Sequence, residues 1–232
     1  MKIGSKLTYY VLPLLVLALL SGCKKSSTQE SSEAKPAPST NAAPASAAAA
    51  NAAAPSTDAT SSAEASAKMA AADWAMKQDE IKNDPNGQWA IQAKASSTYS
   101  DAQGTAPYSA NQATGAPNVD HYADDGAAWA PKTADGGIEW LDLKYPKPVY
   151  ATEVRVRESC GSGTVVKVEI FDEKGTAHPV WQGNDPTKDL NYLLVKFPKT
   201  TFKTDRVKVT LATNVVAGWN EVDAVQLVGT DQ

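Results

Sequence analysis

The clearest pattern in the chain is an alternation of apolar and polar residues in short runs beyond Gly87. Runs of this kind occur at 139–145, 154–157, 166–170, 207–211 and 223–227. In the first run, Leu141, Leu143 and Tyr145 share one face of an extended segment, because successive strand side chains point to opposite sides. The runs are separated by Gly, Pro, Asp and Asn. Residues 88–232 are therefore predicted to form an all-β, antiparallel sandwich or barrel.

The same alternation makes a prediction for two arginines. Arg155 and Arg157 alternate with Val154 and Val156, so they should point away from the core. We expect both guanidinium groups to be solvated and to pair with Glu169 on another strand.

The chain before this region has a different composition. Residues 24–72 are almost entirely Ala, Ser, Pro and Thr and contain no Val, Ile, Leu, Phe or Tyr. Such a segment cannot bury a core, which predicts a disordered linker over residues 23–72. Residues 73–87 are predicted to be a helix and turn that lead into the domain. Alanine-rich composition extends the helix propensity back to Ser62, and Asp-Pro-Asn-Gly at 84–87 predicts the turn.

The first 22 residues have the composition of a secretory signal. A basic start and an apolar run over 7–20 end in small residues before Cys23. Because Cys23 directly follows Leu-Ser-Gly, the segment resembles a bacterial lipoprotein signal. The resemblance implies cleavage before Cys23 and acylation of its thiol and amino groups, which would anchor the protein firmly to a membrane. Lys24 rather than Asp follows the cysteine, which in Gram-negative lipoproteins implies the outer membrane.

Charge and cysteine content restrict the partners. Without residues 1–22 the chain has 20 basic and 26 acidic side chains, a net charge of −6. An acidic chain with no Lys/Arg cluster beyond Lys25 lacks the features of a nucleic-acid-binding protein. With Cys23 assigned to lipid, no internal disulfide framework is expected, and Cys160 is interpreted as a small buried residue at a strand end.

Several short motifs occur in the order found in one group of β-sandwich domains. They lie at 95–100 (Ala-Ser-Ser-Thr-Tyr-Ser), 108–118, 128–131, 139–143, 154–158 and 218–227, which begins Gly-Trp-Asn-Glu-Val-Asp. Together they resemble a discoidin, or coagulation factor 5/8 type C, domain of the galactose-binding-like group. The resemblance covers residues 88–229 and implies an eight-stranded jelly-roll sandwich with its ligand loops at one end. It does not identify the ligand, because such domains bind sugars, lipids, proteins and cell-wall polymers.

The resemblance also implies a candidate calcium site. In calcium-binding relatives a carboxylate from the last strand completes the site, and Glu221 occupies the matching position. The loop at 113–118 lacks the Asp-Gly pair of those relatives. Asn118 and Asp120 are the candidates for the further oxygen ligands that Ca²⁺ needs. The alternative is that the acidic loop residues form turns and are solvated.

Aromatic and polar side chains in the predicted loops form a candidate ligand-binding set. An aromatic ring can pack on the apolar face of a sugar, while amides and carboxylates bind its hydroxyl groups. The set comprises Tyr122, His121, Asp124, Asp125, Asn111, Trp219 and Asn220. Tyr122 is the preferred aromatic residue because its neighbours are polar or small. Trp219 is equally consistent with a core position and with a ligand platform, and Tyr99 and Tyr108 also fall in predicted loops.

No catalytic motif accompanies these residues. The sequence has no His-Glu-x-x-His motif, Cys-x-x-Cys pair or phosphate-binding glycine loop. Asp124 and Asp125 are adjacent, so on an extended chain they would point to opposite sides rather than form a hydrolase pair. We therefore expect a lipid-anchored, non-catalytic binding module of the cell envelope that recognises a glycan or cell-wall component. The alternative is a structural or assembly lipoprotein docked onto an envelope protein.

Overall fold

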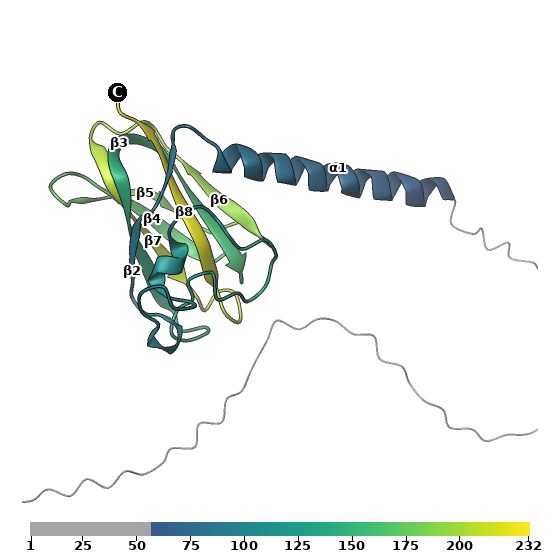
Figure 1. Cartoon of the computed structure of the whole chain (residues 1–232), viewed down its shortest axis with the longest axis horizontal. Helices are drawn as coiled ribbons and strands as arrows, with labels where there is room; N and C mark the ends of the chain where they lie inside the picture. The colour runs from purple at the N-terminus through teal and green to yellow at the C-terminus, as the bar shows by residue number, and fades with distance from the viewer. Residues whose placement is uncertain (1–56) are drawn as a thin grey trace, which may run out of the picture.

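The computed structural model describes residues 57–232, so the predicted signal, Cys23 and most of the predicted linker lie outside the described residues. In this range one α-helix precedes eight strands (Figure 1). They are α1 (Thr57–Lys82), β1 (Gly87–Trp89), β2 (Gln92–Ala95), β3 (Ile138–Cys160), β4 (Val165–Phe171), β5 (Ala177–Gln182), β6 (Asn191–Lys196), β7 (Lys203–Ala212) and β8 (Glu221–Thr230). The long connection between β2 and β3 contains two 3₁₀ helices, η1 (Tyr99–Asp101) and η2 (Ala110–Ala113).

The strands form an antiparallel jelly-roll β-sandwich, which confirms the predicted fold class. Strand β3 belongs to both layers, and its register with β7 shifts between Lys144 and Val149. Its first half pairs with β2 and β7, and β7 continues the layer to β4 and β5. Its second half pairs with β6 and β8, and β8 pairs with β1.

The core between the layers consists of the residues that the alternation placed on the inner face. Leu141, Leu143 and Tyr145 are buried, as are Val154, Val156, Val168, Ile170, Val207, Val209, Leu211, Val225 and Leu227. One position differs from the prediction. Val165 rather than Val166 belongs to the core, because a register shift between Val165 and Lys167 changes which residue faces inward.

Helix α1 confirms the predicted lead-in helix but begins earlier, at Thr57. The prediction of a disordered linker up to residue 72 was therefore wrong for its last part. Figure 1 shows most of the helix projecting from the sandwich. Its C-terminal end lies against β8, where Gln226 Nε2 donates to the Ile81 carbonyl oxygen at 2.9 Å. The predicted turn follows, with the Gly87 N–H donating to the Asp84 carbonyl at 2.9 Å. No helix among the described residues is both long and apolar enough to cross a membrane.

The end of α1 covers the two arginines of β3, so that Arg157 is buried and Arg155 is half-buried, which corrects the expectation that they are solvated and paired with Glu169. Arg157 Nε lies 3.0 Å from Asp223 Oδ2, and Arg157 also donates to Gln78 of the helix. Arg155 pairs with Asp84 in the turn after the helix at 2.9 Å. The face of this layer that points away from the core is therefore partly covered by α1, and the charged groups between them are shielded from solvent.

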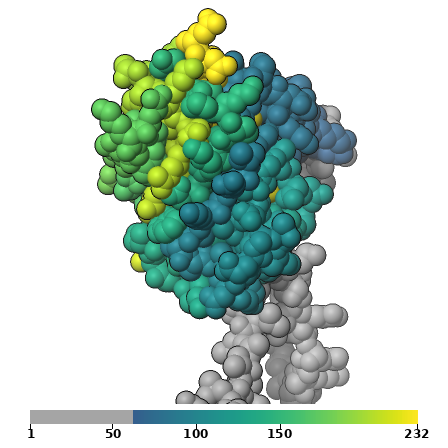
Figure 2. Space-filling model, turned by 60° about the vertical axis from the view of Figure 1, so that its left-hand side comes forward, coloured from purple at the N-terminus to yellow at the C-terminus, as the bar shows by residue number. Residues whose placement is uncertain are grey.

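The connections that carry the predicted ligand residues all lie at one end of the sandwich. Because neighbouring strands run antiparallel, segments 96–137, 161–164, 183–190 and 213–220 leave the sheets at the end opposite the C-terminus. Figure 2 shows the blue and teal atoms of the first segment gathered away from the yellow C-terminal residues. Trp129 fixes this segment to β8, since it is fully buried and exchanges backbone hydrogen bonds of 3.0 and 3.1 Å with Val222.

Candidate functional site

Three aromatic side chains from two distant connections of the chain meet at the loop end. The ring of Tyr99 packs edge-to-face against Trp219, with centroids 5.2 Å apart, and against Tyr108, with centroids 5.1 Å apart. Gly161 lets the 161–164 loop lie close to the 213–220 loop, which carries Trp219. Its φ is +55°, and a Cβ at this position would lie only 2.2 Å from the Trp219 carbonyl oxygen. Tyr99 and Trp219 remain partly exposed, so the aromatic cluster Tyr99–Tyr108–Trp219 presents a fixed apolar surface to solvent.

Carboxyl groups border the aromatic cluster. The Tyr108 hydroxyl donates to Asp124 Oδ1 at 2.7 Å. Asp124 also contacts Glu221, and Glu221 Oε2 accepts the Asp125 N–H at 3.1 Å. Burial raises the pKa of Glu221 to about 8, and the neighbouring Asp124 and Asp125 contribute to this rise. Glu221 therefore holds a proton at neutral pH, and Asp124 is the exposed carboxyl group of the two.

Burial and the contact with Asp124 also raise the pKa of Tyr108. Its hydroxyl therefore remains a hydrogen-bond donor at neutral pH. The site thus combines aromatic surface, a phenol donor and a carboxylate acceptor.

The structure separates the predicted ligand residues into groups. Asp124, Asp125 and Trp219 belong to the site just described. Tyr122 is exposed, and its hydroxyl oxygen accepts the Ser162 N–H at 3.3 Å. Its side chain therefore contacts the 161–164 loop rather than the aromatic cluster. His121 is exposed beside it and contacts Asp120 rather than the aromatic cluster.

The two predicted asparagines have contacts within the loops. Asn220 is buried, and its Nδ2 donates to the carbonyl oxygens of Gly161 at 3.0 Å and Val216 at 3.2 Å. This corrects its assignment as a ligand-binding residue, because its amide joins two loops instead. Asn111 Nδ2 donates to the Gly104 carbonyl at 3.0 Å and lines a separate cavity.

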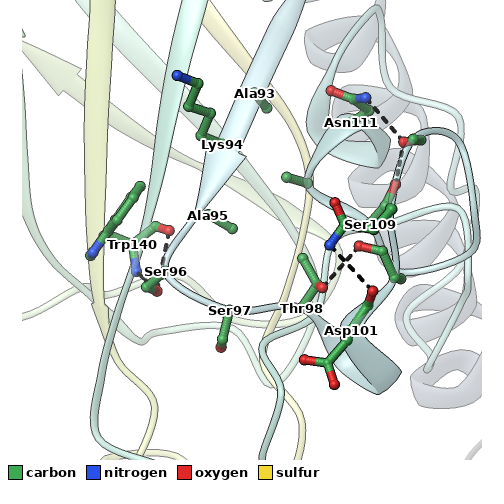
Figure 3. Close-up of a pocket in the computed structure, with 14 residues that line it drawn as sticks. Ala93, Lys94, Ala95, Ser96, Ser97, Thr98, Asp101, Ser109, Asn111 and Trp140 are labelled. Atoms are coloured by element: carbon green, nitrogen blue, oxygen red, sulfur yellow. Dashed lines mark hydrogen bonds between the residues drawn. The ribbon is translucent and has the colours of Figure 1, made fainter. Parts of the chain in front are cut away.

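That cavity has a volume of about 440 Å³ and lies beside β2. Figure 3 shows the small side chains of Ala93 and Ala95 on one side of it, facing Ser109 and Asn111. Ser109 Oγ and Asn111 Nδ2 both donate to the Gly104 carbonyl, at 2.8 and 3.0 Å. Ser109 and Asn111 therefore stabilise the loop that lines the cavity. The aromatic cluster is the better candidate site.

The predicted calcium ligands Asn118, Asp120 and Glu221 each have other partners. Asp120 is exposed, and its Oδ1 lies 2.7 Å from His121 Nδ1, a hydrogen bond that raises the pKa of His121. The Asn118 N–H donates to Asp223 Oδ1 at 3.2 Å. Within residues 57–232 no three His, Cys, Asp or Glu side chains are grouped to hold a metal ion. Calcium at these three residues stays a prediction.

Sequence reasoning ranked Tyr122 above the residues that form the aromatic cluster. Tyr99 and Tyr108 lie in loops, but no local pattern shows that their rings meet Trp219. From the sequence, Tyr99 and Tyr108 are recognisable only as aromatic residues in predicted loops.

Comparison with known proteins gives one family match. A family model described as "Pappalysin-1, SD scarf domain, C-terminal" matches residues 78–232. No curated protein sequence matches the chain.

Solved structures share the arrangement of strands at low identity. A chitosan-binding module from a Paenibacillus sp. IK-5 chitosanase/glucanase is 14% identical, with a TM-score of 0.44 over 60% of this chain and 94% of that one. A Ruminococcus gnavus GH29 fucosidase is 13% identical, with a TM-score of 0.44 over 65% of this chain and 26% of that one. Allantoicase from Saccharomyces cerevisiae is 12% identical, with a TM-score of 0.45 over 62% and 44%. The chain spans only a quarter of the fucosidase, and likenesses at this level carry no functional argument.

Proposed function

The chain belongs to the family of the pappalysin-1 C-terminal SD scarf domain, and we propose that it is a non-catalytic module that binds a glycan. The observation that carries the proposal is the partly exposed pair Tyr99 and Trp219, held rigidly beside the Asp124 carboxylate at the loop end. Aromatic rings pack on the apolar faces of sugars, and a carboxylate accepts hydrogen bonds from their hydroxyl groups. A site that is already ordered loses little entropy on binding.

Replacing Trp219 by Ala tests this proposal. Truncation of a central aromatic contact costs about 2 kcal/mol of binding free energy, which corresponds to an affinity about 30-fold lower. We expect that loss in a titration with the glycan that scores highest on an array or in a cell-wall pull-down. Trp74→Ala is the matched control, because Trp74 is a partly exposed tryptophan of α1 that lies outside the aromatic cluster.

Unchanged affinity in the Trp219→Ala protein would contradict the site, provided that its unfolding temperature stays near that of the wild type. Arrays and cell-wall pull-downs that are blank at high protein concentration would contradict glycan binding itself.

We further propose that Cys23 is lipidated. The lipid would anchor the protein to the outer membrane, with the folded domain in the surrounding water. The support is the Leu-Ser-Gly-Cys sequence at the end of the apolar segment. Helix α1, with 26 residues, adds a rigid spacer of about 39 Å between the anchor and the sandwich. The loop end could then reach a ligand well beyond the lipid headgroups.

Replacing Cys23 by Ser should move the protein from the membrane fraction to the soluble fraction. The expected reason is loss of the acyl chains, each of which contributes about 0.8 kcal/mol per buried methylene. Fractionation and labelling with a radioactive fatty acid measure this, with Cys160→Ser as the control for label at the second cysteine. A Cys23→Ser protein that still partitions with membranes would contradict the anchor.

A second candidate function is docking onto an envelope protein. Helix α1 exposes the large apolar side chains of Met69 and Met76 and partly exposes that of Trp74. A photo-crosslinking residue at position 69 in intact cells should yield one dominant protein adduct if this function holds. Diffuse or absent adducts would favour glycan binding alone.

A further inference from the structure

A second pair of carboxyl groups meets at the loop end, distinct from Asp124 and Glu221. Glu158 comes from the end of β3, and Asp185 from the connection between β5 and β6. Glu158 is only 1% exposed, and burial, together with the neighbouring Asp185 carboxyl group, raises its pKa to about 9. Two neighbouring ionised carboxylates repel each other. A cation between their oxygen atoms would remove this repulsion.

Backbone N–H groups fix both carboxyl groups in place. Glu158 Oε1 accepts the N–H groups of Gly163 at 3.1 Å and Thr164 at 3.5 Å. Asp185 Oδ2 accepts the Val165 N–H at 3.3 Å. Backbone groups of residues 163–165 therefore hold both carboxyl groups at adjacent positions.

Buried oxygen atoms without hydrogen-bond partners lie at the same junction. They include Glu158 Oε2 and the hydroxyl oxygens of Thr164 and Thr187. Both threonines are at least nine-tenths buried, and the N–H of Thr187 donates to Asp185 Oδ1 at 2.8 Å. A buried polar atom without a partner costs about 1–3 kcal/mol. A bound cation would remove that cost for several atoms at once.

Backbone carbonyl groups add to this oxygen-rich surrounding. A Cβ on Gly163 would lie 3.1 Å from the Thr187 carbonyl oxygen and 3.6 Å from that of Asp185. Because Gly163 has no side chain, these carbonyl groups can lie close to the 161–164 loop, whose N–H groups donate to Glu158. Asp185 is partly exposed, which gives an ion and its waters a path to the pair.

We propose that Glu158 and Asp185 bind a calcium ion between loops 161–164 and 183–190. Calcium takes six to eight oxygen ligands, and carboxylates, hydroxyls, carbonyls and water all serve. Zinc, in contrast, prefers nitrogen and sulfur ligands. The two carboxylates together would balance the two positive charges of the ion. This site is separate from the one predicted at Glu221 and does not depend on glycan binding.

Calorimetric titration of the full-length protein in detergent tests the proposal after treatment with EDTA. Added CaCl₂ should show one saturable site and raise the unfolding temperature. Glu158→Gln should abolish both effects, because the amide keeps the acceptor for Gly163 and Thr164 but removes the charge. Glu153→Gln is the matched control, because Glu153 is also a buried glutamate of β3, and it should bind calcium as the wild type does.

Asp185→Asn is a second variant, which lies nearer to solvent and should also lose calcium binding. Its result decides the matter if Glu158→Gln fails to fold. Calcium binding that survives in both variants would overturn the proposal, as would its loss in Glu153→Gln alone. No heat and no thermal shift at millimolar calcium in the wild type would overturn it too.

Discussion

Replacing Arg157 by Ala is expected to lower the free energy of unfolding by about 3–5 kcal/mol, the usual cost of breaking a buried ion pair from one side. The Arg157 side chain is 6% exposed, and its Nε lies 3.0 Å from Asp223 Oδ2. Burial already raises the pKa of Asp223 to about 6, and Arg157 opposes that rise. Without the guanidinium group, Asp223 would either stay charged in the interior or take up a proton.

Urea unfolding at pH 7 measures the loss, and a second arginine provides the control. Arg206 pairs with Asp142, where Nε and Oδ1 are 2.8 Å apart, but its side chain is 42% exposed. Arg206→Ala should therefore cost no more than about 1 kcal/mol. Equal losses in the two variants would show that the arginine under α1 is not buried in solution. The double variant Arg157→Met, Asp223→Leu should recover most of the stability, because neither charge is left unpaired.

The inner faces of the strands were predictable because a period of two is a local property of the sequence. Leu141, Leu143 and Tyr145 each needed only their neighbours to be assigned to the core. The outer face of β3 was not predictable in this way. Arg157 alternates with Val156 as a surface residue does, and it is covered by α1, about 80 residues earlier, and by the loop at Val119.

The candidate site was predictable only as a set of loop residues. The sequence indicates that aromatic and acidic residues fall in connections, but the contact of Tyr99 with Trp219 depends on how distant loops meet. Asn220 and Asp124 are both polar residues near loops, yet one is buried and the other is exposed. Which of them can face a ligand follows from the tertiary structure alone.

The second large expected effect is on the pH dependence of stability. In EDTA, the free energy of unfolding should fall as the pH rises from about 5 to about 9, because Glu158 and Glu221 are buried. Burial raises the pKa of Glu158 from 4.5 to about 9 and that of Glu221 from 4.5 to about 8. Below pH 4.5 both groups are protonated in the folded and unfolded chains. Above it, the unfolded chain releases protons that the folded chain retains, so stability falls until the folded pKa is passed. Each pKa unit is equivalent to about 1.4 kcal/mol, so the total loss should reach several kcal/mol.

Urea unfolding at pH 5, 7 and 9 follows this loss, and isosteric amides assign it to residues. Glu158→Gln should remove the largest part of the pH dependence, because an amide does not titrate, and Glu221→Gln should remove a smaller part below pH 8. Glu173→Gln is the control, since Glu173 is exposed at the turn between β4 and β5 and should leave the profile unchanged. A free energy of unfolding that rises between pH 5 and 9 would contradict the burial of both glutamates. Added calcium should flatten the wild-type profile at high pH, because the ion replaces the proton of Glu158.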